Sequence, residues 1–157
     1  MQRITHCLWF DTRAEEAAKF YVSIFKNAKI TGLSHYGDAG PGPKGSVMTV
    51  TFELDGQEYM GLNGGPHFTF TPAISLVVNC DTQEEIDHYW DKLLADGGKV
   101  VECGWLTDKF GLSWQVVPSK MKTFATGDPE RTNRVMQEVL KMKKLDLATL
   151  QRAYDGK

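Results

Sequence analysis

Residues Gly104–Pro118 have the sequence GWLTDKFGLSWQVVP, which is the most informative part of the chain. The pattern predicts a strand end, a tight turn at Asp108–Gly111 and a returning strand that a proline stops. Side chains of a strand alternate between its faces, so Ser113 and Gln115 share one face and Trp114 lies on the other. A polar pair on one face is either a solvated surface or the floor of a polar pocket.

The composition is typical of one soluble globular domain. The chain has 157 residues, 41% hydrophobic and 24% charged, with a net charge of −2. There is no basic stripe for nucleic acid, no apolar run near the ~18 residues of a membrane span, and no apolar N-terminal signal segment. The three scattered cysteines, Cys7, Cys80 and Cys103, indicate buried free thiols and a cytoplasmic location.

The first part of the chain follows the order strand, helix, strand, strand, strand. A strand over Arg3–Phe10 leads to Thr12-x-x-Glu15, which predicts a capping box for a helix over Ala14–Phe25. The Gly- and Pro-rich segment Gly37–Gly45 predicts a mobile loop. The other predicted strands are Ile30–Tyr36 and a hairpin of Ser46–Leu54 with Gln57–Asn63, turning at Asp55-Gly56.

The same order recurs after about 70 residues, which is too long a period for a solenoid. A strand over Ala73–Asn79 precedes a helix that Asp81-Thr82 caps and that runs to about Ala95. Strands over Lys99–Trp105 and Leu112–Val117 follow. We therefore predict an α+β fold of two paired βαβββ modules, each with a helix-covered and an open concave sheet face, enclosing a cavity.

The predicted boundaries are 1–66 for the first module, 67–118 for the second and 119–157 for a helical tail, within one structural domain. Asp128-Pro129-Glu130 opens the first tail helix, and Asp146 caps the last one. The first helix carries an apolar stripe that includes Val135, Met136, Val139 and Leu140. This stripe must pack either on its own module or across a subunit interface.

Several motifs carry a family resemblance that covers nearly the whole chain. They are Leu8–Asp11 (LWFD), Glu15–Ala17 with Phe20-Tyr21, Asn63–Pro66 (NGGP) with Phe68 and Phe70, Gly104–Pro118, Arg134–Met136, and Met142-x-Lys144-x-Asp146. Together they resemble the vicinal oxygen chelate superfamily of glyoxalase I, bleomycin-resistance proteins and extradiol dioxygenases. Within it, the chain is most similar to the PhnB-like group, labelled "3-demethylubiquinone-9 3-methyltransferase domain".

The resemblance implies a metal held by one residue from each of four strands, usually His or Glu. Carried over, these positions fall on His6, Met60, a residue within Ala73–Ser75, and Gln115. Only the histidine is a usual ligand, because a thioether and an amide do not replace carboxylates for such an ion. We expect no metal and no other cofactor. No glycine-rich loop follows the first strand, so nothing in the sequence supports S-adenosylmethionine chemistry.

The predicted cavity defines the candidate site residues. If Cys7 and Trp9 pack under the helices, then His6, Leu8 and Phe10 face the cavity. The full ligand-binding set is His6, Leu8, Phe10, Met60, Leu62, His67, Ser113 and Gln115, and the catalytic candidates are His6 and Glu58. Each type of residue has an ordinary structural explanation too. The histidine ring can be hydrogen-bonded to the backbone, the apolar residues can be plain core, and the carboxylate can be solvated at a strand edge.

Three functions fit this sequence. The first is a metal-independent protein that binds a small molecule and acts as a homodimer. The second is an enzyme in the same cavity, a lyase, isomerase or transferase that uses His6 or Glu58 for proton transfer, with a divalent metal as one variant. The third is a dimeric interaction module whose cavity is vestigial.

Overall fold

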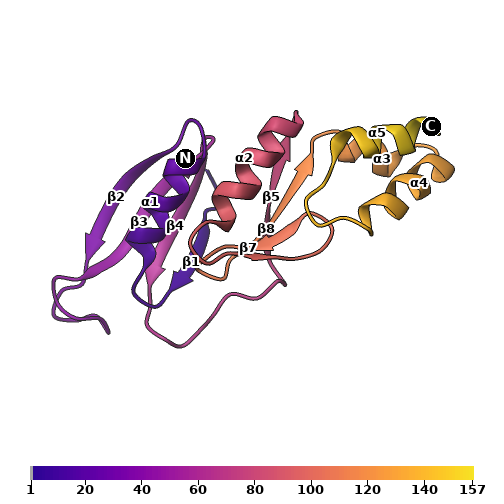
Figure 1. The fold of residues 1–157 in the computed structure, drawn as a ribbon. Coiled ribbons are helices and arrows are strands. Elements are labelled where there is room, and N and C mark those ends of the chain that lie inside the picture. The colour runs from indigo at the N-terminus through magenta and orange to yellow at the C-terminus, as the bar shows by residue number, and fades with distance from the viewer. Residues whose placement is uncertain (1) are drawn as a thin grey trace. The chain divides into compact units, whose positions relative to one another are not determined.

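The structure, a computed structural model, describes residues 2–157 and consists of two compact units. Unit 1 extends to Phe70, and unit 2 runs from Thr71 to Lys157. Each unit contains one four-stranded mixed sheet and a helix between its first two strands (Figure 1). The fold is therefore α+β, as predicted.

Unit 1 is built from β1 (His6–Phe10), α1 (Ala14–Ile24), β2 (Lys29–His35), β3 (Val47–Leu54) and β4 (Gln57–Asn63). Its strand order is β1-β4-β3-β2, in which β1 runs parallel to β4 and the other neighbours are antiparallel. The β3–β4 hairpin turns at Asp55-Gly56, and both residues have positive φ, as an Asp-Gly turn of this kind requires.

The sheet of unit 2 has the same topology as that of unit 1. It is built from β5 (Ser75–Cys80), α2 (Gln83–Leu94), β6 (Lys99–Val100), β7 (Trp105–Thr107) and β8 (Ser113–Pro118), in the order β5-β8-β7-β6. Again the first and last strands are parallel and the others antiparallel. This shared topology confirms the βαβββ repeat.

The single strand predicted over Lys99–Trp105 is wrong, because a turn divides it into β6 and the start of β7. Cys103 and Gly104 both have positive φ, and Trp105 N–H donates to the Glu102 carbonyl at 3.1 Å. Cysteine carries no sequence signal for a left-handed backbone, so only Gly104 could have indicated this turn.

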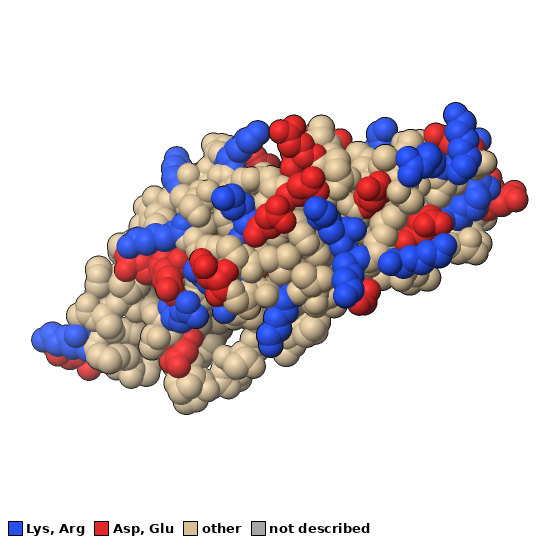
Figure 2. All heavy atoms as spheres, in the orientation of Figure 1, with Lys and Arg blue, Asp and Glu red and all other residues tan. Residues whose placement is uncertain are grey.

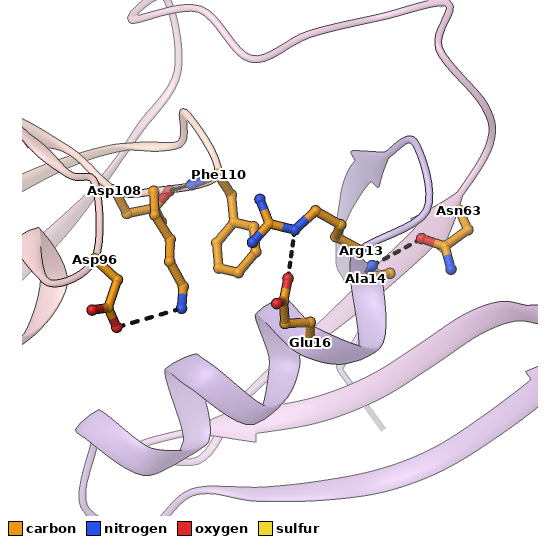
Figure 3. A network of polar contacts seen from close by, with 8 residues as sticks. Arg13, Ala14, Glu16, Asn63, Asp96, Asp108 and Phe110 are labelled. Atoms are coloured by element: carbon orange, nitrogen blue, oxygen red, sulfur yellow. Dashed lines mark hydrogen bonds and ion pairs between the residues drawn. The ribbon is translucent and has the colours of Figure 1, made fainter.

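The predicted capping box is wrong for α1. Arg13 is its N-cap residue and supplies no side-chain cap. Instead, Asn63 Oδ1 accepts a hydrogen bond from Ala14 N–H at 2.8 Å, and Arg13 pairs with Glu16 (Figure 3). In α2, by contrast, Thr82 Oγ1 accepts from Glu85 N–H at 3.2 Å, and Glu85 Oε2 accepts from Asp81 N–H at 2.7 Å.

The core of unit 1 lies between α1 and one face of its sheet. Tyr21 of α1 is fully buried and its ring lies 6.2 Å from that of Phe52 on β3. On β1, the residues on this face are Leu8 and Phe10, which are 7% and 5% exposed. The prediction that Leu8 and Phe10 face a cavity is therefore wrong. Cys7 and Trp9 are as apolar as their neighbours, so hydrophobicity alone could not tell which pair faces the helix.

The tail packs on its own unit and forms three helices, of which the sequence predicted two. These are α3 (Met121–Thr126), α4 (Pro129–Val139) and α5 (Leu147–Asp155). They enclose a buried cluster of Phe124, Val135, Val139, Leu145 and Leu150. Val135 and Val139 of the predicted stripe belong to this cluster, whereas Met136 and Leu140 remain 42% and 66% exposed.

The surface carries charges of both signs in close alternation. Figure 2 shows acidic and basic side chains interspersed on the face drawn, without a continuous basic stripe. Within residues 2–157, no helix has both the length and the apolar character needed to cross a membrane.

Candidate functional site

The sheet face of unit 1 opposite α1, here called open face 1, carries partly exposed apolar and hydroxyl side chains. The register pairs Cys7 with Met60 and Trp9 with Leu62, so all four side chains lie on this face. Thr49 and Thr51 of β3 lie beside Leu62 and Met60. Thr51 Oγ1 also accepts a hydrogen bond from Thr31 Oγ1 at 2.9 Å.

The two catalytic candidates do not meet, because they lie on opposite faces of neighbouring strands. His6 pairs with Tyr59 on the α1 side, where their ring centroids are 5.5 Å apart, and it is exposed at the start of β1. Glu58 lies on open face 1, and its Oε1 accepts a hydrogen bond from Thr5 Oγ1 at 3.2 Å. A shared proton-transfer or metal site of His6 and Glu58 is therefore wrong for this geometry.

In unit 2, the alternation predicted for residues 112–117 is confirmed. Trp114 is 2% exposed, on the side of α2. Ser113 and Gln115 lie on the opposite side, here called open face 2, and Gln115 Nε2 donates to Ser75 Oγ at 3.0 Å. Ser113 is 1% exposed, whereas Gln115 is partly exposed beside Trp105. Their role in ligand binding stays a prediction.

Asp108 organises the turn before β8, a role that the sequence reading missed. Its carboxylate is buried and accepts three hydrogen bonds: from Phe110 N–H at 2.9 Å, from Leu112 N–H at 3.1 Å and from Trp114 Nε1 at 2.8 Å. Figure 3 shows Asp108 and Phe110 in this turn. An aspartate at the first position of a turn ending in glycine was the available signal.

The thiols of Cys80 and Cys7 do not have the lowered pKa of a reactive nucleophile. Cys80 is fully buried next to Glu85 and Asp81, and burial foremost raises its pKa to about 12. Cys7 is exposed, so the prediction that all cysteines are buried is wrong. Partial desolvation by the sheet still raises the pKa of the Cys7 thiol. Both thiols are therefore protonated at neutral pH.

A hollow in unit 1, here called the Tyr36 pocket, has a volume of about 460 Å³. Its walls come from the first turn of α1, the loop 37–46 and the segment 63–67, which brings His67 to its edge. The loop predicted to be mobile is closed at its base by two hydrogen bonds: Gly45 N–H donates to the Tyr36 carbonyl, and Tyr36 N–H to that of Ser46, both at 2.8 Å. Its mobility stays a prediction. Apart from His67, none of the predicted ligand-binding residues lines this pocket.

The carried-over metal positions do not form a ligand set. His6 and Met60 lie on opposite faces of the sheet of unit 1. Throughout the described residues 2–157, no three His, Cys, Asp or Glu side chains come together in a group that could hold a metal ion.

Comparison with known proteins supports the family that the motifs suggest. Residues 2–117 match the family model described as 3-demethylubiquinone-9 3-methyltransferase. A Bacillus cereus structure described as a 3-demethylubiquinone-9 3-methyltransferase, PhnB protein, is 43% identical. The match covers 74% of this chain and 99% of that chain, with a TM-score of 0.68. The helical tail, residues 119–157, lies outside the family match.

More distant structures share the fold alone. Protein PA1353 from Pseudomonas aeruginosa is 22% identical, with coverage of 75% of this chain and 98% of that chain and a TM-score of 0.61. The fosfomycin resistance protein FosX from Listeria monocytogenes is 14% identical, with coverage of 78% and 96% and a TM-score of 0.52. A search of curated proteins gives no match. From its topology, its motifs and these likenesses, the chain belongs to the 3-demethylubiquinone-9 3-methyltransferase (PhnB-like) family of the vicinal oxygen chelate superfamily.

Proposed function

We propose that this protein binds a small molecule on the open faces of its sheets, without a metal ion. The observation that carries the proposal is the asymmetry of each sheet. One face is sealed by a helix of the same unit, and the other presents partly exposed groups that include Met60, Leu62 and Gln115. Apolar surface with a few placed polar groups is what small-molecule sites need.

The proposed contacts differ between the two faces. On open face 1, Met60, Leu62 and Trp9 offer apolar and aromatic surface beside the threonine hydroxyls of β3. On open face 2, the Gln115 amide already donates to Ser75, and its oxygen can still accept. Apolar surface on open face 1 suits a partly apolar ligand, and the Gln115 oxygen on open face 2 suits a neutral ligand that donates a hydrogen bond. Leu8 and Phe10 leave the proposed set because they are core residues.

Methyl transfer is not part of the proposal, although it appears in the family description. Common S-adenosylmethionine enzymes use a doubly wound parallel sheet with a glycine-rich turn after the first strand. Here β1 leads into Asp11-Thr12-Arg13, and both sheets are mixed. We further propose that the protein is a cytoplasmic homodimer, as free cysteines and exposed apolar side chains such as Val77 favour.

A ligand screen with a matched pair of variants tests the proposed site. Aromatic and carbonyl metabolites are screened by thermal shift on metal-free protein, and each hit is titrated against Gln115→Leu and Gln137→Leu. Gln137 is an exposed residue of α4, so it controls for the change itself. We expect Gln115→Leu to weaken binding by about fivefold, from loss of one hydrogen bond worth about 1 kcal/mol, and Gln137→Leu to change nothing. Hits that need added metal would refute the proposal, and hits that respond equally to both variants would remove open face 2 from it.

The position of Glu58 supports a second candidate function, an enzyme that uses this carboxylate for proton transfer. Glu58 shares open face 1 with Met60, so it can reach a ligand bound there, whereas His6 cannot serve as its partner. If the protein is an enzyme, a hit from the screen will be chemically changed on incubation, and Glu58→Gln will lower turnover by ~10²–10⁴-fold with binding kept. The same loss in His6→Gln but not in Glu58→Gln would contradict this assignment.

A further inference from the structure

The Tyr36 pocket has the dimensions and walls of a ligand site, and the proposed function does not use it. Its volume of about 460 Å³ falls within the roughly 300–1,000 Å³ of small-molecule pockets. Pro41 and Pro43 from the loop, Val47, Pro66 and the ring of Tyr36 give it apolar walls. None of the residues named for open face 1 lines it, so the two surfaces are separate.

The loop is shaped to hold this pocket open beside the tyrosine. Tyr36 is 6% exposed, and its hydroxyl donates to the carbonyl of Asn63. Gly40 and Gly42 lie so close to the ring that a Cβ atom on either would approach it to 2.4 Å or 2.3 Å. Larger residues at these two positions would force the loop and the ring apart.

The charge of the lining is negative. Asp11 and Glu15 line the pocket, and its lining includes no lysine or arginine. Within residues 2–157, no cation lies within ion-pair distance of Asp11, and Glu15 faces only the exposed Lys19 at 3.6 Å. With Glu15 beside Lys19, the main uncompensated charge is that of Asp11, and the partial charge of about +0.5 at the N-terminus of α1 is smaller. The net field therefore favours a cation.

We propose that the Tyr36 pocket binds a small organic cation with an apolar body, such as a substituted ammonium compound. The carboxylate of Asp11 would face the positive centre, and the proline-rich walls would bury the apolar body. The aromatic rings of Tyr36 and His67 add the electron-rich surface that such cations prefer. This site is independent of the ligand proposed for the open faces.

The charge preference is tested with three probes of similar size. Benzyltrimethylammonium, benzyl alcohol and phenylacetate are titrated into ¹⁵N-labelled protein, and the amide signals of Gly42, Gly65 and His67 are followed. We expect saturable shifts with the cation only, weakened about fivefold by Asp11→Asn and by added salt, and unchanged by Asp38→Asn. Asp38 is the control because it belongs to the loop 37–46 but does not line the pocket, and its side chain is 86% exposed. Equal binding of the neutral or anionic probe, no shift with the cation, or equal effects of both variants would overturn the proposal.

The role of the loop is tested with a second matched pair. A Cβ at Gly42 would collide with the Tyr36 ring, whereas a Cβ at Gly37 would meet nothing within 4 Å. We expect Gly42→Ala to weaken binding of benzyltrimethylammonium at least about tenfold while the protein stays folded by circular dichroism, and Gly37→Ala to bind as the wild type does. Unaltered binding in folded Gly42→Ala, or shifts that centre on Met60 instead, would show that the cation does not occupy this pocket.

Discussion

At the scale of single residues, one buried carboxylate fixes the turn before β8. Asp108 is 3% exposed and accepts hydrogen bonds from two backbone amides and from the Trp114 indole. These bonds hold Trp114 on the α2 side of the sheet. Because side chains alternate along a strand, they also hold Gln115 on open face 2.

Removing the Asp108 carboxylate leaves three donors without their acceptor. We expect Asp108→Ala to lower the free energy of unfolding by about 3 kcal/mol, since each unsatisfied buried donor costs roughly 1–3 kcal/mol. Urea unfolding followed by tryptophan fluorescence measures this loss. The exposed Asp38→Ala should stay within about 0.5 kcal/mol of wild type. A stability for Asp108→Ala equal to that of Asp38→Ala would mean that the turn does not depend on these bonds.

Single residues also show where sequence reading succeeds and where it stops. The alternation over 112–117 predicted the orientation of Gln115, because polar and apolar residues distinguish the two faces there. On β1 both faces are apolar, so the same reasoning chose the wrong one, and only the pairing with β4 shows that Leu8 and Phe10 face α1. The Tyr36 pocket depends on packing between loop and ring, which no local pattern in the sequence specifies.

At the scale of elements, two similar helix starts are capped in different ways. Thr82 caps α2 through its hydroxyl, but Thr12 has no such bond and Asn63 of β4 caps α1 instead. Asn63 Nδ2 also donates to the Val47 carbonyl at 3.1 Å, so one amide ties the helix to the sheet. A capping motif of four residues cannot reveal a cap supplied from 49 residues away.

The same substitution at the two threonines should therefore have different effects. We expect Thr82→Ala to cost about 1 kcal/mol of stability, the usual value for a lost helix cap, and Thr12→Ala to cost less than about 0.5 kcal/mol. Chemical denaturation of both variants under identical conditions makes the comparison. If Thr12→Ala were the more destabilising, the capping of α1 by Asn63 would be the wrong account.

The start of α5 should make stability depend on pH. Asp146 Oδ1 accepts from Thr149 N–H at 2.8 Å, and this bond foremost lowers the pKa of its carboxyl. The carboxylate's contribution is therefore complete above about pH 4 and is lost as the pH falls through the lowered pKa. We expect Asp146→Asn to melt below wild type at pH 7, with the difference closing at low pH. Asp91→Asn, at an exposed position of α2, should follow wild type throughout, and a constant offset for Asp146→Asn would argue against the charge effect.

At the scale of the whole molecule, the repeat was predictable but the tail was only partly so. Two copies of one strand and helix order are visible in the sequence, because each copy must separately cover one face of its sheet. Helix α3 was missed because its six residues show too little periodicity. The tail is tied to α2 by Gln83, which accepts from Leu147 N–H at 2.8 Å and donates to the Leu145 carbonyl at 3.1 Å.

The packing of the tail on its own unit predicts a large difference between two leucines. Leu150 is fully buried and Leu140 is 66% exposed. We expect Leu150→Ala to destabilise the protein by about 2–5 kcal/mol and Leu140→Ala by less than about 0.5 kcal/mol. Thermal unfolding of both variants measures the difference. Comparable losses would mean that the Leu140 side of α4 is buried too, as in a subunit interface.

The most direct test of ligand binding on the open faces uses the methyl signals of the methionines. Protein labelled with ¹³C at the methionine methyl groups and treated with chelator is titrated with the hits of the ligand screen. Met60 reports on open face 1, and Met136, exposed on α4, serves as an internal control. The account predicts saturable shifts of the Met60 signal, without metal, while the Met136 signal stays fixed. Hits that leave Met60 unmoved and are also unaffected by Gln115→Leu, or that move Met60 only after a divalent metal is added, would contradict it.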